Sequence, residues 1–271
     1  MPDVPSPPPS SPAPLLWRAL ALPEPPDAAP VVAFVGGGGK TSLLYRLGRE
    51  ATARGWRVVL CGTVRFTGAP RPYAMPEVVS DDDARLPDRV REAWARGATV
   101  VVASGVDPGR PGRLVAVAPA TVDAFARLDG VAGVFVEADG SRQLPLKAPG
   151  DHEPVIPVSA TGVVALVGAD ALDAPLDEAH VHRPERVRAI CDRPACDADL
   201  IARVLTSPRG GRQYAGGRAF AVVVNKADHD PAGARALGER VAAMGVHRVI
   251  VARLADEGVP VDAVIAASGA T

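Results

Sequence analysis

A run of four glycines between an apolar strand and a helix constrains this chain most. The predicted strand is Val31–Val35, and the helix-like stretch after the glycines is Thr41–Arg54. Because glycine has no Cβ, its main-chain N–H groups can turn around an anion. A helix start adds unpaired N–H groups and partial positive charge. This order of elements predicts a triphosphate-binding loop. The residues expected to bind the phosphates are Gly36, Gly37, Gly38, Gly39, Lys40, Thr41 and Ser42.

Two side chains in this loop have specific expected roles. Lys40 should reach the β- and γ-phosphates, and the Thr41 hydroxyl should bind Mg²⁺. The usual eight-residue pattern has glycine six positions before the lysine, where this chain has Phe34. We therefore expect a tighter loop than usual. The alternative is a glycine-rich turn that only joins a strand to a helix.

The rest of the chain alternates apolar runs with helix-like stretches. Runs this apolar are typical of strands covered on both faces of a parallel sheet. A turn over Asp107–Gly112, followed by Leu114–Val117, predicts a short antiparallel excursion. We predict a doubly wound, mainly parallel α/β sheet of the three-layer, Rossmann-like P-loop NTPase class. The further predicted strands are Arg57–Leu60, Thr99–Ala103, Val131–Val136, Val163–Val167, Ala219–Val224 and Arg248–Val251, and a further helix is Ala232–Met244.

Proline content divides the chain into two parts. Eleven prolines lie in residues 1–30, which we interpret as a tail and connector. Residues 1–14 are expected to be disordered or polyproline-like, whereas Leu15–Leu22 could form a short docking helix. Residues 31–271 are expected to form the nucleotide-binding domain.

Charge and cysteine content narrow the expected partners and compartment. Thirty Lys and Arg residues nearly balance 31 Asp and Glu residues, so no overall field favours nucleic acid or an anionic membrane. No apolar run approaches the roughly 18 residues of a membrane span. The three cysteines are too few for a disulfide framework. We expect a cytoplasmic protein that binds neither nucleic acid nor membrane.

A second motif, Asn225-Lys226-Ala-Asp228, follows the predicted strand Ala219–Val224. It resembles the Asn-Lys-x-Asp motif of GTP-binding proteins. There a carboxylate accepts hydrogen bonds from guanine, and adenine would leave that acid unpaired. Asn225 should brace neighbouring loops, and the Lys226 stem should cover the base. The motif favours GTP over ATP, with a polar turn as the alternative.

A third motif, Glu137-Ala-Asp139-Gly140, follows the predicted strand Val131–Val136. An acid at the end of a core strand can hold the Mg²⁺ of a nucleotide and orient the attacking water. Its spacing is similar to the Glu-x-x-Gly motif of metal-delivering GTPases, in which the Gly140 N–H would sense the γ-phosphate. Either Glu137 or Asp139 could hold the metal, or merely cap the next helix.

Three segments together resemble the YqeC-type proteins. The segments are Glu137–Arg142, Leu144–Pro149 and His152–Pro157, with His182-Arg183-Pro184-Glu185 further on. The resemblance extends over most of residues 30–250. Members of this family are described as accessory proteins of selenium-dependent molybdenum hydroxylases. The resemblance thus implies a maturation factor whose partner is such a hydroxylase or its cofactor.

Several further residues are candidates for a second substrate. Basic side chains after the acidic strand could stabilise transferring phosphoryl charge or bind an anionic precursor, although solvated surface charges would follow the same pattern. His180, His182, Cys191 and Cys196 have poor spacing for a zinc site. The candidates for substrate contacts are Arg142, Lys147, His152 and Arg183, and Thr63 and Arg65 could approach the Mg²⁺.

The motifs together predict a Mg²⁺-dependent NTPase that hydrolyses GTP, or alternatively ATP. Lys40, Glu137, Asp139 and Gly140 are the expected catalytic residues. Two other functions fit the same motifs. One is a kinase- or ligase-like enzyme that transfers a phosphoryl group to a small molecule. The other is a nucleotide-gated binding module in which hydrolysis is incidental.

Overall fold

A mostly parallel sheet of nine strands organises the chain. The computed structural model describes residues 15–26, 28–68, 75–256 and 258–267. Along the sheet the strand order is β14-β13-β12-β10-β1-β8-β2-β5-β4, and β14 runs antiparallel to β13. The strands are β1 Val31–Gly36, β2 Arg57–Gly62, β4 Glu77–Val79, β5 Thr99–Ala103, β8 Val131–Glu137, β10 Gly162–Gly168, β12 Ala219–Asn225, β13 Val249–Ala252 and β14 Val261–Ile265.

All seven apolar runs predicted from the sequence form strands of this sheet. Strand β10 is buried at every position, and β5 likewise, as expected for strands covered on both faces. The short β4 and the antiparallel β14, which close the two edges, were not among the predicted runs. The prediction of an α/β fold with a mainly parallel sheet is confirmed.

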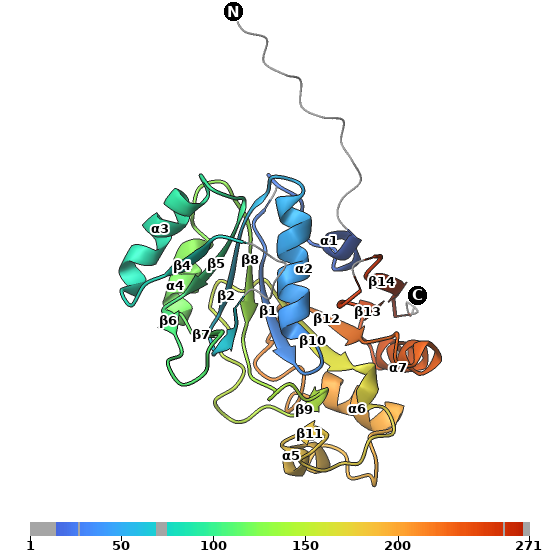
Figure 1. Ribbon diagram of the computed structural model, residues 1–271. Helices are drawn as coiled ribbons and strands as arrows, with labels where there is room; N and C mark the ends of the chain where they lie inside the picture. The colour runs from blue at the N-terminus through green and yellow to red at the C-terminus, as the bar shows by residue number, and fades with distance from the viewer. Residues whose placement is uncertain (1–14, 27, 69–74, 257, 268–271) are drawn as a thin grey trace, which may run out of the picture.

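Helices cover both faces of the sheet (Figure 1). On one face, α2 and α1 pack against alternate residues of the central strands, such as Phe34 and Phe135. On the other face, two neighbouring clusters hold α6 with α7 and α3 with α4. The helices are α1 Leu15–Ala19, α2 Lys40–Thr52, α3 Leu86–Ala93, α4 Pro119–Phe125, α5 Pro184–Arg188, α6 Ala198–Thr206 and α7 Pro231–Ala243, and two 3₁₀ turns span Asp83–Arg85 and Ala169–Ala171.

Two small sheets lie beside the main one. The antiparallel excursion predicted after Asp107 is present as β6 Gly105–Val106 and β7 Arg113–Val115, with β3 Phe66–Thr67 added to its edge. The second small sheet pairs β9 Leu146–Lys147 with β11 Val181–His182 in parallel. It brings segments about 35 residues apart side by side, below the main sheet in Figure 1.

A docking helix forms at Leu15–Ala19, within the stretch where the sequence suggested one. Trp17 is fully buried, and its ring meets Trp56 and Phe135 edge-on at centroid distances of 4.9 and 5.5 Å. The Trp17 Nε1–H donates to the Pro23 carbonyl at 2.9 Å. The connector after the helix is thereby held against the body. The predicted tail, residues 1–14, lies outside the described residues.

Trp17→Ala should lower the free energy of unfolding by about 3 to 5 kcal/mol, because it empties a buried aromatic site. The neighbouring Arg18 is exposed, so Arg18→Ala should change stability by less than about 0.5 kcal/mol. Urea denaturation of the two variants measures the difference. Equal unfolding midpoints would show that the docked helix contributes nothing to the stability of the body.

Candidate functional site

The motifs singled out in the sequence meet at one edge of the main sheet. Strand β1 lies between β8 and β10, and β12 follows β10. These strands are parallel, so their carboxyl ends share an edge. Gly36 ends β1, Glu137 ends β8 and Asn225 ends β12. The glycine loop therefore opens between an acidic strand end and the Asn225 turn.

Close packing beneath the loop requires glycine at Gly38. Its φ is +72°, and an added Cβ would lie 2.0 Å from the main-chain nitrogen of Gly168. A side chain there would clash with the backbone at the end of β10. Gly39, with φ +135°, precedes the first residue of α2, and its added Cβ would lie 2.2 Å from the Asn225 side chain. The loop is thus pressed onto two neighbouring strand ends.

Most N–H groups of the four glycines donate to protein atoms, whereas the sequence predicts that they bind phosphates. The N–H of Gly36 donates to both carboxylate oxygens of Asp139 at 3.1 Å. The N–H groups of Gly37 and Gly38 donate to main-chain carbonyls at 3.0 and 3.2 Å. Three of the four glycines are therefore held by the protein itself. Within the described residues, the N–H groups of Gly39–Ser42 have no acceptor, so these four can receive an anion.

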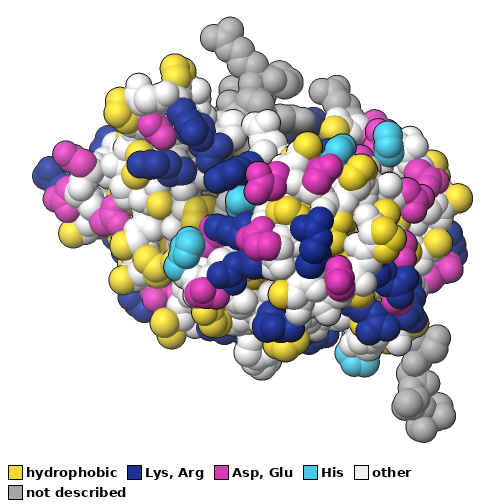
Figure 2. Space-filling model, turned by 90° about the horizontal axis from the view of Figure 1, so that it is seen from below, with side chains coloured by type: hydrophobic (Ala, Val, Ile, Leu, Met, Phe, Trp, Pro, Cys, Tyr) yellow, Lys and Arg dark blue, Asp and Glu magenta, His cyan; other side chains and the backbone are white. Residues whose placement is uncertain are grey.

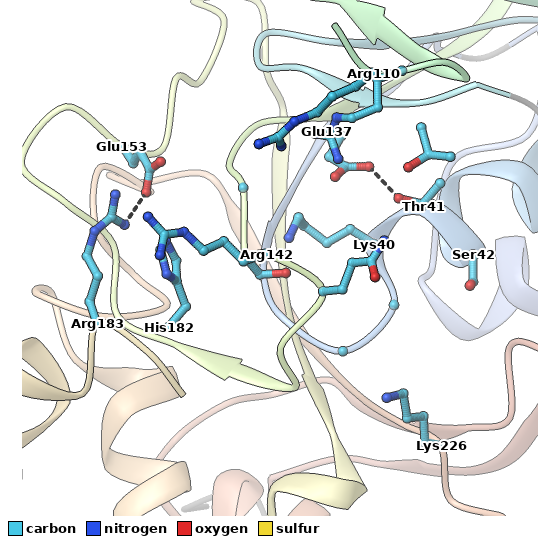
Figure 3. A pocket seen from close by; sticks show the side chains of 17 residues that line it. Lys40, Thr41, Ser42, Arg110, Glu137, Arg142, Glu153, His182, Arg183 and Lys226 are labelled. Carbon is cyan, nitrogen blue, oxygen red and sulfur yellow. Dashed lines mark hydrogen bonds and ion pairs between the residues drawn. The ribbon is translucent and has the colours of Figure 1, made fainter. Parts of the chain in front are cut away.

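Thr41 and Glu137 form a polar pair at the mouth of the loop. The Thr41 hydroxyl donates to Glu137 Oε2 at 2.8 Å (Figure 3). Glu137 is 7% exposed, and its burial raises the pKa of the carboxyl, although the Lys40 charge and the Thr41 hydroxyl act in the opposite direction. A hydroxyl beside a strand-end carboxylate is a suitable pair for a hard cation such as Mg²⁺.

The part of the chain that the structure describes contains no group of three or more His, Cys, Asp or Glu side chains that could hold a metal. A cation beside Thr41 and Glu137 would therefore need oxygen ligands from a bound anion or water. Within the described residues, no such group is formed by His180, His182, Cys191 and Cys196.

A chain of buried ion pairs runs away from the loop. Lys40 Nζ contacts Asp139 at 3.2 Å, and Lys147 Nζ contacts the other oxygen of Asp139 at 3.0 Å. Lys147 also contacts Glu153 at 2.7 Å, and Glu153 contacts Arg183 at 2.7 Å. The Lys147 side chain is fully buried, so it is not a solvated surface charge. Opposite charges alternate along the chain, which offsets the desolvation of each.

A cleft of about 560 Å³ opens over the loop. Its lining is rich in basic side chains, and Figure 2 shows Lys and Arg side chains gathered across this lower face. Basic groups outnumber the two acids that line the cleft, Glu137 and Glu153. Such a lining favours an anionic ligand. The basic residues that line it are Lys40, Arg110, Arg113, Arg142, Arg183 and Lys226.

Many of the predicted site residues line this cleft. Gly36 and Asp139 instead line a small adjacent void, while Asn225 lies buried behind the loop. The predicted residues in the cleft lining are Gly38, Gly39, Lys40, Thr41, Ser42, Glu137, Gly140, Arg142, Arg183 and Lys226.

Four predicted contact residues are not in the cleft lining. The Thr63 hydroxyl donates to the Val155 carbonyl at 2.6 Å, and Arg65 faces Asp107 at 3.6 Å with its side chain 66% exposed. His152 is 78% exposed. Lys147 belongs to the ion-pair chain beneath the cleft.

Only part of the Asn225–Asp228 motif lies at the glycine loop. The Asn225 side-chain amide donates to the Gly38 carbonyl at 2.7 Å, and its oxygen accepts from the Leu254 N–H at 2.9 Å. It therefore braces two loops, as the sequence suggested. Lys226 lines the cleft and pairs with Asp170 at 2.5 Å. Asp228 instead lines a separate cavity of about 490 Å³ beside β13 and α7.

Seven further residues of the cleft lining are not among the site residues predicted from the sequence: Thr67, Arg110, Arg113, Ser141, Gln143, Glu153 and His182. The turn Asp107–Gly112, with Arg113 directly after it, is the signal for the two arginines, but it predicts only a turn and a short antiparallel excursion and not their place in the cleft. His182 is buried, and burial together with the charges of Arg183, Lys147 and Arg142 lowers its pKa to about 4. Its imidazole is therefore neutral at pH 7.

Comparison with known proteins places the chain in a family. The family model described as "YqeC protein" matches residues 32–185, more than half of the chain. The chain belongs to the YqeC family. The match includes the glycine loop, Glu137–Arg142 and His182–Glu185, which confirms the resemblance seen in the sequence. It ends before Asn225, so the base-reading motif lies outside it.

A YqeC relative from Escherichia coli (strain K12), named "Uncharacterized protein YqeC", is 33% identical over 153 residues. The aligned part is 56% of this chain and 57% of the relative. The chain thus spans little more than half the length of that protein. No helix in the described parts of this YqeC chain has the length and apolar character that crossing a membrane requires.

The Glu153 ion pairs should make stability depend on acid pH. Burial alone would raise the pKa of Glu153, but hydrogen bonds from Arg183 and Lys147 outweigh burial and hold it at about 2, below the ordinary 4.5. The carboxylate therefore stabilises the fold above its ordinary pKa. That contribution, up to about 3 kcal/mol, is lost as the pH falls from about 4.5 toward 2.

Urea denaturation between pH 7 and pH 3 should accordingly show a shallower acid loss of stability for Glu153→Gln than for the wild type. Glu92→Gln, at an exposed position on α3, is the matched control and should keep the wild-type slope. Identical slopes for all three proteins would mean that Glu153 is not held in these ion pairs.

Proposed function

We propose that the chain binds a nucleoside triphosphate at Gly39–Ser42 and belongs to the P-loop class of NTPases. The supporting observation is the start of α2, where four N–H groups without acceptors in the described structure line a basic cleft. A helix N-terminus of this kind attracts phosphate oxygens. Lys40 and the Thr41–Glu137 pair border the same opening.

In this proposal Lys40 would bind the phosphates from the position in which Asp139 holds it. Its ammonium group donates to the Gly36 carbonyl and contacts Asp139 at 3.2 Å, with the side chain 3% exposed. A triphosphate at the helix start would offer this ammonium oxygen partners of higher charge than the carbonyl. The lysine would then stabilise the charge that develops during cleavage of the γ-phosphate.

Mg²⁺ fits the pair Thr41 and Glu137 better than it fits Asp139. The Asp139 carboxylate is already bound to the Gly36 N–H, Lys40 and Lys147, and it is 1% exposed. Bound Mg²⁺ would neutralise phosphate charge. Glu137 and Gly140 line the cleft. In this proposal the Glu137 carboxylate and the Gly140 N–H would orient an attacking water, which would yield hydrolysis.

We further propose GTP as the preferred nucleotide, with ATP as the alternative. The support is the Asn225–Asp228 sequence, whose Asn225 braces the loop and whose Lys226 lines the cleft. Asp228 lies beside Arg253 in the neighbouring cavity, so guanine recognition requires its carboxylate to turn toward the cleft.

A role in the maturation of a selenium- or molybdenum-dependent hydroxylase is the physiological function that the family resemblance favours. The supporting facts are the family match over residues 32–185 and the cleft built from the matched residues. A nucleotide-driven step on an anionic cofactor precursor is compatible with the basic lining of the cleft.

Lys40→Ala should weaken binding of GTP and ATP by about tenfold or more, because a charge-assisted contact to the phosphates is lost. Release of inorganic phosphate should fall to background. Isothermal titration calorimetry and a phosphate-release assay measure these effects, with circular dichroism to verify the fold. Arg127→Ala, at an exposed position outside the cleft, is the control and should behave as the wild type. Unchanged affinity in Lys40→Ala would overturn the proposal.

Asp228→Asn should weaken GTP and strengthen xanthosine triphosphate, because the amide exchanges an acceptor for a donor toward the base. Competition against a fluorescent nucleotide analogue gives both affinities. Asp230→Asn, at an exposed position two residues away, is the matched control. If neither affinity responds to Asp228→Asn, the guanine assignment is wrong even though triphosphate binding can stand.

A further inference from the structure

One end of the cleft holds basic groups that lie away from the phosphate loop. Figure 3 shows the side chains of Arg142, His182 and Arg183 together on one side, with Thr41 and Ser42 on the other. Glu153, which the Arg183 guanidinium contacts, borders the same end. We call Arg142, His182 and Arg183 the arginine subsite.

The backbone holds both arginines of this subsite in an unusual conformation. Arg142 and Gln143 have φ of +52° and +66°, and Arg183 has φ of +64°. Non-glycine residues adopt the left-handed region at some energetic cost, and such residues cluster at binding sites. Here the turns place two guanidinium groups, from segments about 40 residues apart, in one cleft.

Positive charge at the subsite exceeds what the protein neutralises. Arg183 shares the single carboxylate of Glu153 with Lys147. Within the described residues, the Arg142 guanidinium has no acidic partner and no hydrogen-bond acceptor. His182 is buried beside them and can donate a hydrogen bond without adding charge.

We propose that the arginine subsite binds an oxyanion, the phosphate or carboxylate group of a small second substrate held beside the triphosphate. Guanidinium groups bind both kinds of oxyanion with paired, charge-assisted hydrogen bonds. The cleft of about 560 Å³ suits a small molecule. This assignment rests on the proposed function only in naming a triphosphate as the neighbour of the oxyanion. Binding of the oxyanion itself does not depend on the nucleotide site.

Inorganic phosphate is the probe, titrated by ³¹P NMR into the full chain saturated with a non-hydrolysable GTP analogue and Mg²⁺. With the phosphate loop filled, one phosphate should still bind the wild type. Arg142→Gln should weaken this binding by about tenfold or more, because an ionised hydrogen-bond donor is removed. Arg142→Lys should restore part of the affinity by retaining the charge. Arg127→Gln is the matched exposed control and should leave it unchanged.

Two further arms separate this proposal from the nucleotide site. In Lys40→Ala, phosphate should still bind even where no nucleotide binds, and Arg142→Gln added to this variant should weaken that binding. Failure of the nucleotide proposal therefore does not remove the subsite. Displacement of phosphate by malonate would assign a carboxylate-bearing substrate, whereas failure of malonate to compete would assign a phosphate-bearing one.

Two results would overturn the assignment. The first is phosphate affinity that is identical in the wild type and in folded Arg142→Gln. The second is the absence of any phosphate binding once the loop is filled or Lys40 is removed. Thermal denaturation of each variant verifies that it is folded.

Discussion

The arrangement of the site depends on the contacts that the buried Asp139 carboxylate makes with its neighbours. It accepts the Gly36 N–H and contacts both Lys40 and Lys147, at almost no exposure to solvent. Removal of one partner from a buried ion pair costs about 3 to 5 kcal/mol, because the remaining charge is stranded. Asp139, which belongs to the segment after β8, therefore holds that segment against the loop after β1. The ion pairs of Glu153 with Lys147 and with Arg183 continue from there, so a continuous series of ion pairs joins the two ends of the cleft.

The sheet could be predicted from the sequence because its strands are unusually apolar. Strand β10 is buried at every position and β12 from Ala221 onward, and this burial is visible in the sequence as apolar runs rich in Val. The edge strands are less visible. Strand β4 has three residues and β14 alternates between partly buried and exposed positions, so neither produces a long apolar run.

The loop side of the site could be predicted because local sequence order determines it, from strand to glycines to helix. The opposite side could be predicted only in part, since Arg142 and Arg183 were candidates from the sequence whereas Arg110 and His182 were not. Arg110 lies in a hairpin whose strand β7 also pairs with the distant strand β3, and His182 lies in β11, which pairs with β9. Both depend on contacts between distant segments. The same limit applies to the N–H groups of Gly36–Gly38, which are bound by Asp139 and by the main-chain carbonyls of Leu166 in β10 and of Leu144 before β9.

Triphosphate binding at the start of α2 can be tested by a crystal structure of the full chain with a non-hydrolysable GTP analogue and Mg²⁺ at saturating concentration. We expect phosphate oxygens within about 3 Å of the N–H groups of Gly39–Ser42. The Lys40 ammonium should contact the outer phosphates, and the cation should lie beside Thr41 and Glu137. A map with no phosphate density at the start of α2, or with the nucleotide bound elsewhere, would contradict this expectation.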